Sequence, residues 1–556
     1  MCVSKQQQAD SARSQCQDSR WGVRKRPAAA AHGDGADELA LQQPSAAKPR
    51  RLDPRLKESA IAPGSIIEKF VQHAWEKLSA KQRQTLCDAV QVEARHTLSS
   101  ACSGSGMAEV AHAVLMEMLG VDSKLVFSCE KESWKQRHLQ ECVHDKLDPN
   151  SIGCLFSDLS DLASGKGHCI IHSEDCEIKA NSFLFTIGYS CKTLSKNSSV
   201  PKANILADGI GSSGETCHAM LHHIQACRPR VGLLENVDEM AKSEAESTNV
   251  EFLLNACRDL GYCMHVELFN SSKFHLPHER KRAFALILDY RAFGVSQEVG
   301  EDILRKILKL SLSFGSGPGR LSEWLLPASD PMLVAELQRR QSKSKSDIEK
   351  IDKGTGYIKK HQSFMALKGI SWTRLQAPPS TANSPWYQVL PRREQEIIAM
   401  AMELEPHATM VTIQPSIDRA QWPSSGLLPT ITTNSKYYLM YVDHQNAGKE
   451  KQEAGGGKKP RKKKPLDRLM LGWELLRAQG FPMSLIPQQG FISDRECTDL
   501  AGNAFSSTVV VSVMIGIYVY AQDLTASEQL GAGSLEEAAK ATESDDMQGI
   551  AALLRD

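Results

Sequence analysis

Apolar residues recur along the chain with two different periods, and each period predicts a different kind of element. After Ser65 they return at helical spacing, which predicts an amphipathic helix. Its apolar positions are Ile66, Ile67, Phe70, Val71, Ala74, Trp75 and Leu78. Farther along, short apolar runs typical of strands alternate with helical patterns. The predicted strands span 96–102, 124–130, 152–159, 181–189, 231–237, 262–269 and 282–290, and the predicted helices 106–119, 133–143, 214–227 and 247–259.

This alternation predicts an α/β fold with a doubly wound, Rossmann-like parallel sheet and helices on both faces. Outside this part of the chain the alternation of predicted strands and helices stops, and the composition indicates further regions. The predicted regions are a disordered basic tail at 1–60, a core at 61–290, a smaller separate region at 291–425, a return to the core at 426–445 and 466–521, a flexible Gly- and Lys-rich linker at 446–465, and a peripheral tail at 522–556. The apolar run at 507–521 is too short for a membrane span, so we expect a packed core helix there.

Composition narrows the classes of function. The formal net charge is zero, so a polyanion would have to meet a local basic patch. The fifteen cysteines include no C-x-x-C pair, which argues against a zinc ribbon, a zinc finger and a dithiol redox motif, and we predict no metal site. We expect no signal peptide, and reduced thiols. Two basic clusters, 48–57 and 458–465, are typical of nuclear-import signals and predict a nuclear protein; solvated loops that touch nucleic acid are the alternative.

A candidate cofactor site follows the first predicted strand. Small residues around Gly104 and Gly106 let a ligand approach the backbone and the start of the next helix. Glu130 ends the second strand and Asp158 the third, where ligands bind in doubly wound sheets. Glu130 is then placed to bind two ribose hydroxyls and Asp158 an adenine amino group. The chain has no Gly-Lys-Ser/Thr phosphate loop, which disfavours a nucleoside triphosphate. A ligand with a ribose and an adenine but no phosphate, S-adenosylmethionine, fits better, and a dinucleotide remains the alternative.

A candidate reactive pair follows two later strands. Cys191 comes after the strand at 181–189, and Glu235 lies near the end of the strand at 231–237. A thiolate that adds to C6 of a pyrimidine, together with a carboxylic acid at N3, can activate C5 of the base. Taken alone, each residue is more often an ordinary buried cysteine or an ordinary strand-end glutamate than a catalytic group. Their order after the cofactor motifs favours the chemical interpretation.

The order of these motifs resembles that of the cytosine-5 methyltransferase family, over about residues 96–290 and 425–521. The similar segments are ACSGSGM with Cys102, Gly104, Gly106 and Met107, then Ser190-Cys191-Lys192, Leu234-Glu235-Asn236-Val237, LPHERKR with Arg280 and Arg282, ELLRAQGFP at 474–482, and AGNAF with Asn503. The resemblance implies an S-adenosylmethionine-dependent methyltransferase domain with a smaller target-recognition domain at 291–425.

The resemblance also implies roles for the matching residues. Cys191 would be the nucleophile on C6, and Glu235 would hold N3 and the exocyclic amine. Arg280 and Arg282 would hold the base and a nearby phosphate, and Asn503 would support the cofactor and the catalytic loop. The implied partner is DNA, with the target base flipped out of the duplex.

Several positions depart from the family pattern: Met107, Ser190, Lys192, His278, Leu471 and Trp473. Gly-Tyr-Ser-Cys-Lys at the reactive cysteine is similar to divergent, protist-like members. Two alternatives to a DNA methyltransferase stay open. One is an RNA cytosine-5 methyltransferase, since both nucleic acids supply the same base. The other is a catalytically silent nucleic-acid-binding paralogue.

Overall fold

The computed structural model describes residues 55–147, 153–196, 198, 204–241, 249–342, 356–372, 375–414, 416–442, 464–486 and 492–521. Most of the predicted N-terminal tail and linker, and the whole tail at 522–556, lie outside the described residues.

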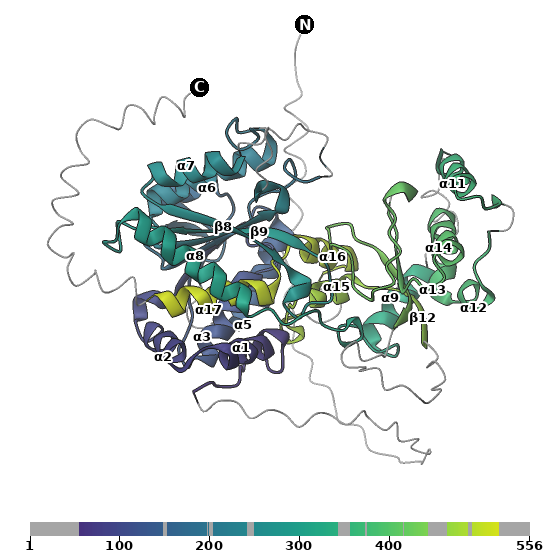
Figure 1. Cartoon of the computed structure of the whole chain (residues 1–556), viewed down its shortest axis with the longest axis horizontal. Helices are drawn as coiled ribbons and strands as arrows, with labels where there is room; N and C mark the ends of the chain where they lie inside the picture. The colour runs from purple at the N-terminus through teal and green to yellow at the C-terminus, as the bar shows by residue number, and fades with distance from the viewer. Residues whose placement is uncertain are drawn as a thin grey trace, which may run out of the picture. The chain divides into compact units, whose positions relative to one another are not determined.

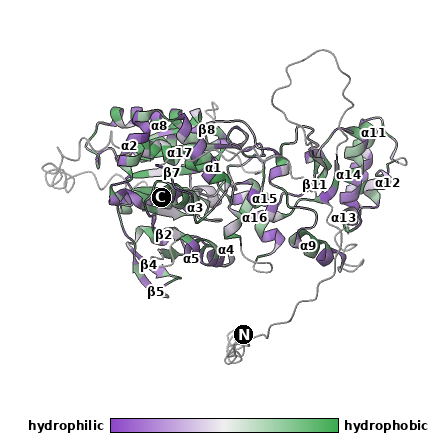
Figure 2. Ribbon diagram, turned by 90° about the horizontal axis from the view of Figure 1, so that it is seen from below, coloured by the Kyte–Doolittle hydropathy of each residue, from purple (hydrophilic) through white to green (hydrophobic). Residues whose placement is uncertain are grey.

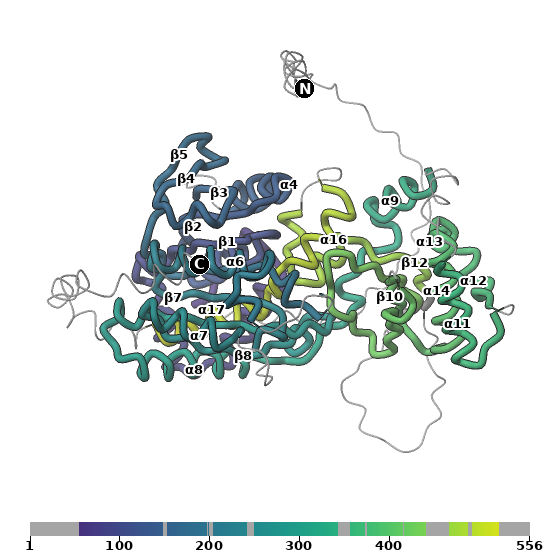
Figure 3. Tube along the Cα trace, turned by 90° about the horizontal axis from the view of Figure 1, so that it is seen from above, coloured from purple at the N-terminus to yellow at the C-terminus, as the bar shows by residue number. Residues whose placement is uncertain are grey.

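A large mixed sheet runs through the described part of the chain, with the strand order β5-β4-β3-β2-β1-β6-β7-β9-β8 (Figure 3). Its strands are β1 (Thr97–Ala101), β2 (Lys124–Cys129), β3 (Cys154–Phe156), β4 (Lys166–Cys169), β5 (Glu174–Glu177), β6 (Leu184–Ile187), β7 (Val231–Val237), β8 (Cys263–Asn270) and β9 (Lys281–Leu288). The five central strands, β3-β2-β1-β6-β7, are parallel, as the alternating pattern predicts.

Both edges of the sheet differ from the predicted parallel arrangement. On one side β9 runs antiparallel between β7 and β8. On the other, β4 and β5 form a hairpin antiparallel to β3. The last two predicted strands are joined by a connection with no long helix, so they pair with opposite directions. The hairpin strands are short and mostly polar, and their pattern carried no strand signal.

Helices cover both faces of the sheet, and neighbouring strand residues point into different cores. On β7, Leu233 belongs to one apolar cluster and Leu234 to the other. The first cluster takes in α1 (Ile66–Lys77), α2 (Ala80–Ala89), α3 (Met107–Met118), α8 (Gln297–Ser313) and α17 (Ser507–Tyr520), and the second α6 (Gly211–Cys227) and α7 (Asn249–Asp259) (Figure 1). This three-layer arrangement confirms the predicted Rossmann-like fold class.

Two of the helical predictions are confirmed by the structure. Helix α1 begins after Ser65, whose side chain accepts a hydrogen bond from the Glu68 N–H and caps the helix. Helix α17 is buried along nearly its whole length. The span Asp494–Tyr520 is long and apolar enough to cross a membrane. However, 89% of its most apolar stretch is buried in the fold, as in a core helix. Figure 2 shows hydrophobic residues along α17 and the central strands.

A second, smaller core lies between residues 326 and 471. It joins helices to a three-stranded antiparallel sheet in the order β10-β11-β12. Its elements are α9 (Pro331–Gln341), α11 (Gly356–Leu367), α12 (Pro379–Ala382), α13 (Pro385–Gln388), α14 (Arg392–Leu404), β10 (Met410–Thr412), β11 (Tyr437–Val442) and β12 (Lys464–Leu469).

The boundaries of this second region differ from the expected 291–425. Helix α8 packs in the large core, where Ile307 lies against α17 at Gly516. Strands β11 and β12, expected in the large domain, belong to the small sheet, and Tyr438 and Leu469 lie in the small core. After β12 the chain returns to the large core through α15 (Gly472–Ala478) and α16 (Asp494–Asn503).

Candidate active site

The predicted site residues lie together at the carboxyl ends of the parallel strands. Cys102, Glu130 and Asp158 follow β1, β2 and β3, and Cys191 and Glu235 lie at the same ends of β6 and β7. These strands are parallel neighbours, so their carboxyl ends lie on the same side of the sheet. The strand order reverses direction between β1 and β6, the position where ligands bind in open α/β sheets.

A strained turn forms the start of this site. Between β1 and α3 the backbone has φ values of 51° at Cys102, 55° at Gly104 and 71° at Gly106. A side chain at Gly106 would place its Cβ 2.8 Å from Val143 Cγ2. Val143 lies on a π-helical segment, Leu139–His144, that continues from α4 (Ser133–His138). Glycine at 106 therefore lets α4 pack against the turn, and the turn leads directly into the buried Met107 of α3.

Glu130 supports this turn from the neighbouring strand. Its carboxylate accepts hydrogen bonds from the Gly104 N–H at 2.9 Å and the Glu132 N–H at 3.0 Å. The residue is 8% exposed, so these bonds form away from bulk water. Burial, and then the charge of Glu130, raise the pKa of the Cys102 thiol to about 12, which keeps the thiol neutral.

Asp158 lies one strand farther and is more open. Its carboxylate accepts bonds from the backbone N–H of Ser160 at 3.0 Å and from the Ser160 hydroxyl at 2.8 Å. The bond from the Ser160 backbone is the main cause that lowers the pKa of Asp158. The side chain is 42% exposed, so it stays charged and within reach of a ligand.

An ion pair holds helix α16 beside this turn. The sequence patterns did not predict this pair. Lys135 on α4 is buried and binds Asp499 on α16 at 2.9 Å. Burial opposes the charge of Lys135, but the hydrogen bond to Asp499 and the charge of Glu130 raise its pKa overall. Asn503 donates to the same Asp499 carboxylate at 3.1 Å. Asn503 thus lies beside the predicted cofactor site, and Asp499 and Lys135 fix its helix there.

The loop that carries Cys191 is docked on the start of α6. The Ser190 N–H donates to Thr216 Oγ1 at 3.1 Å, and the Ser190 hydroxyl bonds to Ser212 at 3.0 Å. The family that the motifs resemble has proline at this position, and proline has no N–H, so it could not make the bond to Thr216. The serine at position 190 therefore makes bonds to α6 that proline could not make, and these bonds hold the loop of Cys191 in place.

Asn236 ties the reactive loop to β7. This buried side chain donates to the Tyr189 carbonyl at 3.1 Å and accepts from the Val237 N–H at 2.8 Å. The loop approaches β7 closely: a Cβ on Gly188 would lie 3.5 Å from Glu235 Oε2 and 3.4 Å from the Phe505 ring. The loop of Cys191, the strand of Glu235 and the segment that follows Asn503 therefore meet at Gly188.

Glu235 and Arg282 form an ion pair beside Cys191. Arg282 Nε lies 3.2 Å from Glu235 Oε1, because antiparallel pairing of β9 with β7 sets Arg282 opposite Val237. Burial and the charge of Glu235 raise the pKa of the Cys191 thiol, while Arg282 and Arg280 oppose that rise. Cys191 is partly exposed, so the thiol is open to a ligand while its charge is controlled by these neighbours.

Arg280 has a different arrangement from the one expected. Its guanidinium donates to the backbone carbonyls of Ile431, Gly502 and Ala504 at 2.8–3.1 Å, and the residue is 3% exposed. Burial, and then the charge of Arg282, lower its pKa to about 9. In this structure Arg280 joins three chain segments and is not open to a phosphate. Nearby, His278 is fully buried and its pKa is lowered to about 3, mainly by burial, so it is neutral.

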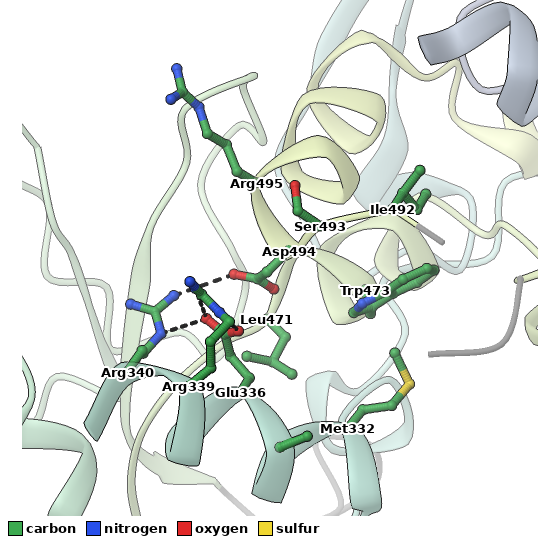
Figure 4. Close-up of a pocket in the computed structure, with 11 residues that line it drawn as sticks. Met332, Glu336, Arg339, Arg340, Leu471, Trp473, Ile492, Ser493, Asp494 and Arg495 are labelled. Atoms are coloured by element: carbon green, nitrogen blue, oxygen red, sulfur yellow. Dashed lines mark hydrogen bonds and ion pairs between the residues drawn. The ribbon is translucent and has the colours of Figure 1, made fainter. Parts of the chain in front are cut away.

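Two further departures, Leu471 and Trp473, line a cavity of about 560 Å³ away from these groups. Its walls come from α9 and from the start of α16, and none of its lining residues is a predicted site residue. Figure 4 shows Arg340 bridging Glu336 and Asp494 across it, at 2.7 and 3.4 Å. The family that the motifs resemble usually has threonine and arginine in place of Leu471 and Trp473, and here both side chains line this cavity.

Comparison with known proteins finds a matching family model and a curated relative. The family model for the C-5 cytosine-specific DNA methylase matches residues 170–518. The DNA (cytosine-5-)-methyltransferase DMT5 of Cryptococcus neoformans var. grubii is 22% identical over 420 residues, which are 70% of this chain and 15% of that protein. The chain thus spans only a small part of this relative's length.

Solved structures with similarity include the Dnmt2 methyltransferase of S. pombe, with 15% identity and a TM-score of 0.38 over 77% of this chain and 99% of that one. The Entamoeba histolytica methyltransferase EhMeth has 11% identity and a TM-score of 0.38 over 77% of this chain and 98% of that one. The family model covers well over half of the sequence. The chain therefore belongs to the C-5 cytosine-specific DNA methylase family.

Proposed function

We propose that this chain is an S-adenosylmethionine-dependent DNA (cytosine-5-)-methyltransferase that acts through a covalent bond between Cys191 and a flipped-out cytosine. The observation that carries the proposal is the meeting of Cys191 with the Glu235–Arg282 pair, next to the turn supported by Glu130. A partly exposed thiol, a carboxyl group and a cation are the groups that addition to a pyrimidine requires.

The residues at the ends of β1 to β3 fit S-adenosylmethionine. A side chain at Gly104 would meet only the Cys102 carbonyl within 4 Å, so a ligand can approach the backbone there. The Ser105 hydroxyl is buried with no hydrogen-bond partner in the described part of the chain. We expect Glu130 to hold the ribose hydroxyls with its remaining lone pairs and Asp158 the adenine amino group. When bound, this cofactor supplies an electrophilic methyl group.

The reactive residues then have separate tasks. The Cys191 thiolate bonds to C6 of cytosine, and the π electrons of the C5–C6 bond make C5 a nucleophile that would take up the methyl group. Loss of the C5 proton to solvent then re-forms the C5–C6 double bond and releases the Cys191 thiolate. The Glu235 carboxylate accepts from the exocyclic amine and, once it has taken up a proton, donates to N3, which stabilises the negative charge that addition places on the ring. Arg282 orients Glu235 and favours the thiolate. Arg280 acts as a positioning residue, because it holds the carbonyls of the segments that enclose the site.

DNA is the proposed substrate, with the small domain at residues 326–471 as its target-recognition region. The basic stretch at 337–361 and the linker at 446–465 would meet phosphates, which predicts binding that weakens steeply with salt. The basic cluster at 458–465 also supports a nuclear protein. A fluorescent fusion of the full chain that leaves the nucleus when these lysines are changed would agree with that location; an unchanged distribution would contradict it.

Covalent trapping tests the proposed function. The purified protein is incubated with S-adenosylmethionine and with DNA or, separately, RNA that contains 5-fluorocytosine. Fluorine at C5 cannot leave as a proton does, so the adduct persists through denaturation. We expect an adduct on DNA that is absent in Cys191→Ser, while cofactor affinity of that variant stays near normal. An adduct on RNA alone would replace the DNA substrate with RNA, and no adduct from folded protein would favour the silent paralogue.

A further inference from the structure

Four potential metal ligands lie together outside the candidate active site. Three sulfurs surround one histidine nitrogen: His172 Nδ1 lies 3.3 Å from Cys169 Sγ, 3.3 Å from Cys176 Sγ and 3.7 Å from Cys154 Sγ. All four ligand atoms are within 4.8 Å of one another. The three cysteines form no disulfide. The reaction proposed above uses none of these side chains.

The β4–β5 hairpin and its neighbour β3 bring these residues together. In the hairpin, Cys169 pairs with Glu174 and Cys176 with Gly167, so both cysteines are on the same face. The turn between the strands closes with a 2.8 Å bond from the Ser173 N–H to the Cys169 carbonyl, and Ser173 has a φ of 55°. This tight turn folds His172 back over the sulfurs. Pairing of β3 with β4 at Phe156 then sets Cys154 beside them.

The spacing of the ligand atoms fits a tetrahedral zinc ion. Zinc bonds of about 2.3 Å to sulfur and about 2.1 Å to nitrogen place neighbouring ligand atoms roughly 3.6 Å apart for sulfur and nitrogen, and roughly 3.8 Å for two sulfurs. The observed distances from His172 Nδ1, 3.3–3.7 Å, lie close to that value. A disulfide would require two sulfurs about 2.05 Å apart, leaving the third thiol and the histidine without a role.

The strands of the hairpin bury few side chains of their own. All of β5 is exposed except for partial burial of Cys176, and β4 buries only Gly167 and Cys169. Small elements that bury little apolar surface are commonly fixed by a metal. Figure 2 shows the hairpin at the edge of the sheet, with hydrophilic residues along β5.

We propose that this hairpin binds a structural zinc ion through four side chains: Cys154, Cys169, His172 and Cys176. Four protein ligands complete the tetrahedron, so no position remains for water or substrate, as in structural rather than catalytic zinc sites. The ion fastens the hairpin to β3, two residues before Asp158. The prediction of no metal site rested on the absence of C-x-x-C, whereas this set is C-x2-H-x3-C at 169–176 completed by a distant cysteine.

Metal content and cobalt substitution of the full chain test the proposal. We expect about one zinc ion per chain in protein purified with reduced thiols and without chelator. After exchange, cobalt should give the intense visible absorption of tetrahedral coordination together with thiolate charge-transfer bands. His172→Ala should weaken zinc binding by at least about tenfold in competition with a chromophoric chelator, since even residues behind the ligands matter by that much.

His168→Ala is the matched control. This histidine lies on the same hairpin, is 65% exposed and belongs to no ligand set, so its removal should leave zinc affinity unchanged. The cobalt spectrum of the wild-type chain needs no variant, so it decides the case even if His172→Ala folds poorly. Reduced protein that takes up neither zinc nor cobalt would overturn the proposal. So would a disulfide among these cysteines found by mass spectrometry under reducing conditions, or equal zinc loss in both histidine variants.

Discussion

Cys191 is surrounded by groups that act on its pKa in opposite directions. Burial and Glu235 raise the pKa, and Arg282 and Arg280 lower it. A thiol with a raised pKa is mostly protonated at neutral pH, so its reactivity increases as the pH rises toward that pKa. Glu235 thus limits the thiolate in the absence of substrate, whereas Arg282 favours it, and a change of either charge should shift the balance.

We predict that Glu235→Gln lowers the pKa of Cys191. The variant removes a negative neighbour and frees Arg282 from its 3.2 Å pair, and both changes favour the thiolate. Alkylation of Cys191 by iodoacetamide, followed by peptide mass spectrometry across a pH series, should then show a midpoint at lower pH and a several-fold higher rate at pH 7. Methyl transfer should nevertheless be lost, because Glu235 is the proposed acid.

Glu235→Asp is the control for this prediction, because it keeps the negative charge and should leave the midpoint near that of the wild type. A midpoint that stays in place or moves to higher pH in Glu235→Gln would show that Glu235 does not act on the thiol. Sequence reasoning could pair Cys191 with Glu235 because both follow strands of one sheet. It could not predict the bonds of Arg280, because backbone carbonyls from distant segments leave no mark in the residue pattern.

At the scale of elements, helix α16 is held against α4 beside the cofactor turn. The pair of Lys135 with Asp499 makes this connection, and Glu130 also acts on the Lys135 charge. If Asp499 loses its charge, the buried ammonium group keeps Glu132 as a partner at 3.2 Å and is free to move toward Glu130, whose carboxylate is the proposed ribose ligand. The connection therefore keeps Lys135 from competing with the cofactor.

We predict that Asp499→Asn weakens S-adenosylmethionine binding about tenfold, which corresponds to about 1.4 kcal/mol. Isothermal titration calorimetry measures the affinity, and urea unfolding checks that the fold survives. Glu496→Gln is the matched control: it alters the capping box at the other end of α16 and should change stability more than cofactor affinity. Equal cofactor affinity in Asp499→Asn and the wild type would remove Lys135 and Asp499 from the site.

Elements with regularly spaced apolar residues could be predicted from the sequence. Elements that form only because of the strands or helices they pack against could not. Helix α17 and the central strands carry long apolar runs, and both are found where expected. Strand β5, Glu174–Glu177, is short and charged, so its local pattern resembles a loop. Helix α8 falls within the range 291–425 expected for the smaller region but packs in the large core, because an apolar stripe does not reveal which core it faces.

At the scale of the whole molecule, the family match and the sheet begin at different places. The match starts at residue 170, yet β1, β2 and β3 precede it and belong to the same sheet as β6 and β7. The proposed cofactor site, at the ends of β1, β2 and β3, requires few specific residue types, because it needs only certain backbone conformations and carboxylates at strand ends. Gly104, Glu130 and Asp158 could therefore be identified by their position in the predicted sheet more readily than by similarity of sequence.

The chain passes between its two cores twice, and both passages meet at one buried ion pair. Arg468 and Glu474 are joined by two bonds, at 2.7 and 2.9 Å, with side chains 4% and 0% exposed. Glu474 also accepts the N–H groups of Leu326, on the outward passage, and Leu471, on the return. The pair thus fixes the position at which the proposed target-recognition region leaves the large domain.

We predict that Arg468→Met lowers the free energy of unfolding by about 3–5 kcal/mol, because it leaves the Glu474 charge buried without its partner. The double variant Arg468→Met with Glu474→Gln should lose much less than the sum of the two single variants, since neither charge then remains and Gln still offers an acceptor to a backbone N–H. Urea unfolding of the full chain measures all three. Asp302→Asn, at an exposed pair on α8, should leave stability unchanged. Additive losses in the double variant would mean that the two side chains act separately, and the two passages would then be held together by packing rather than by this pair.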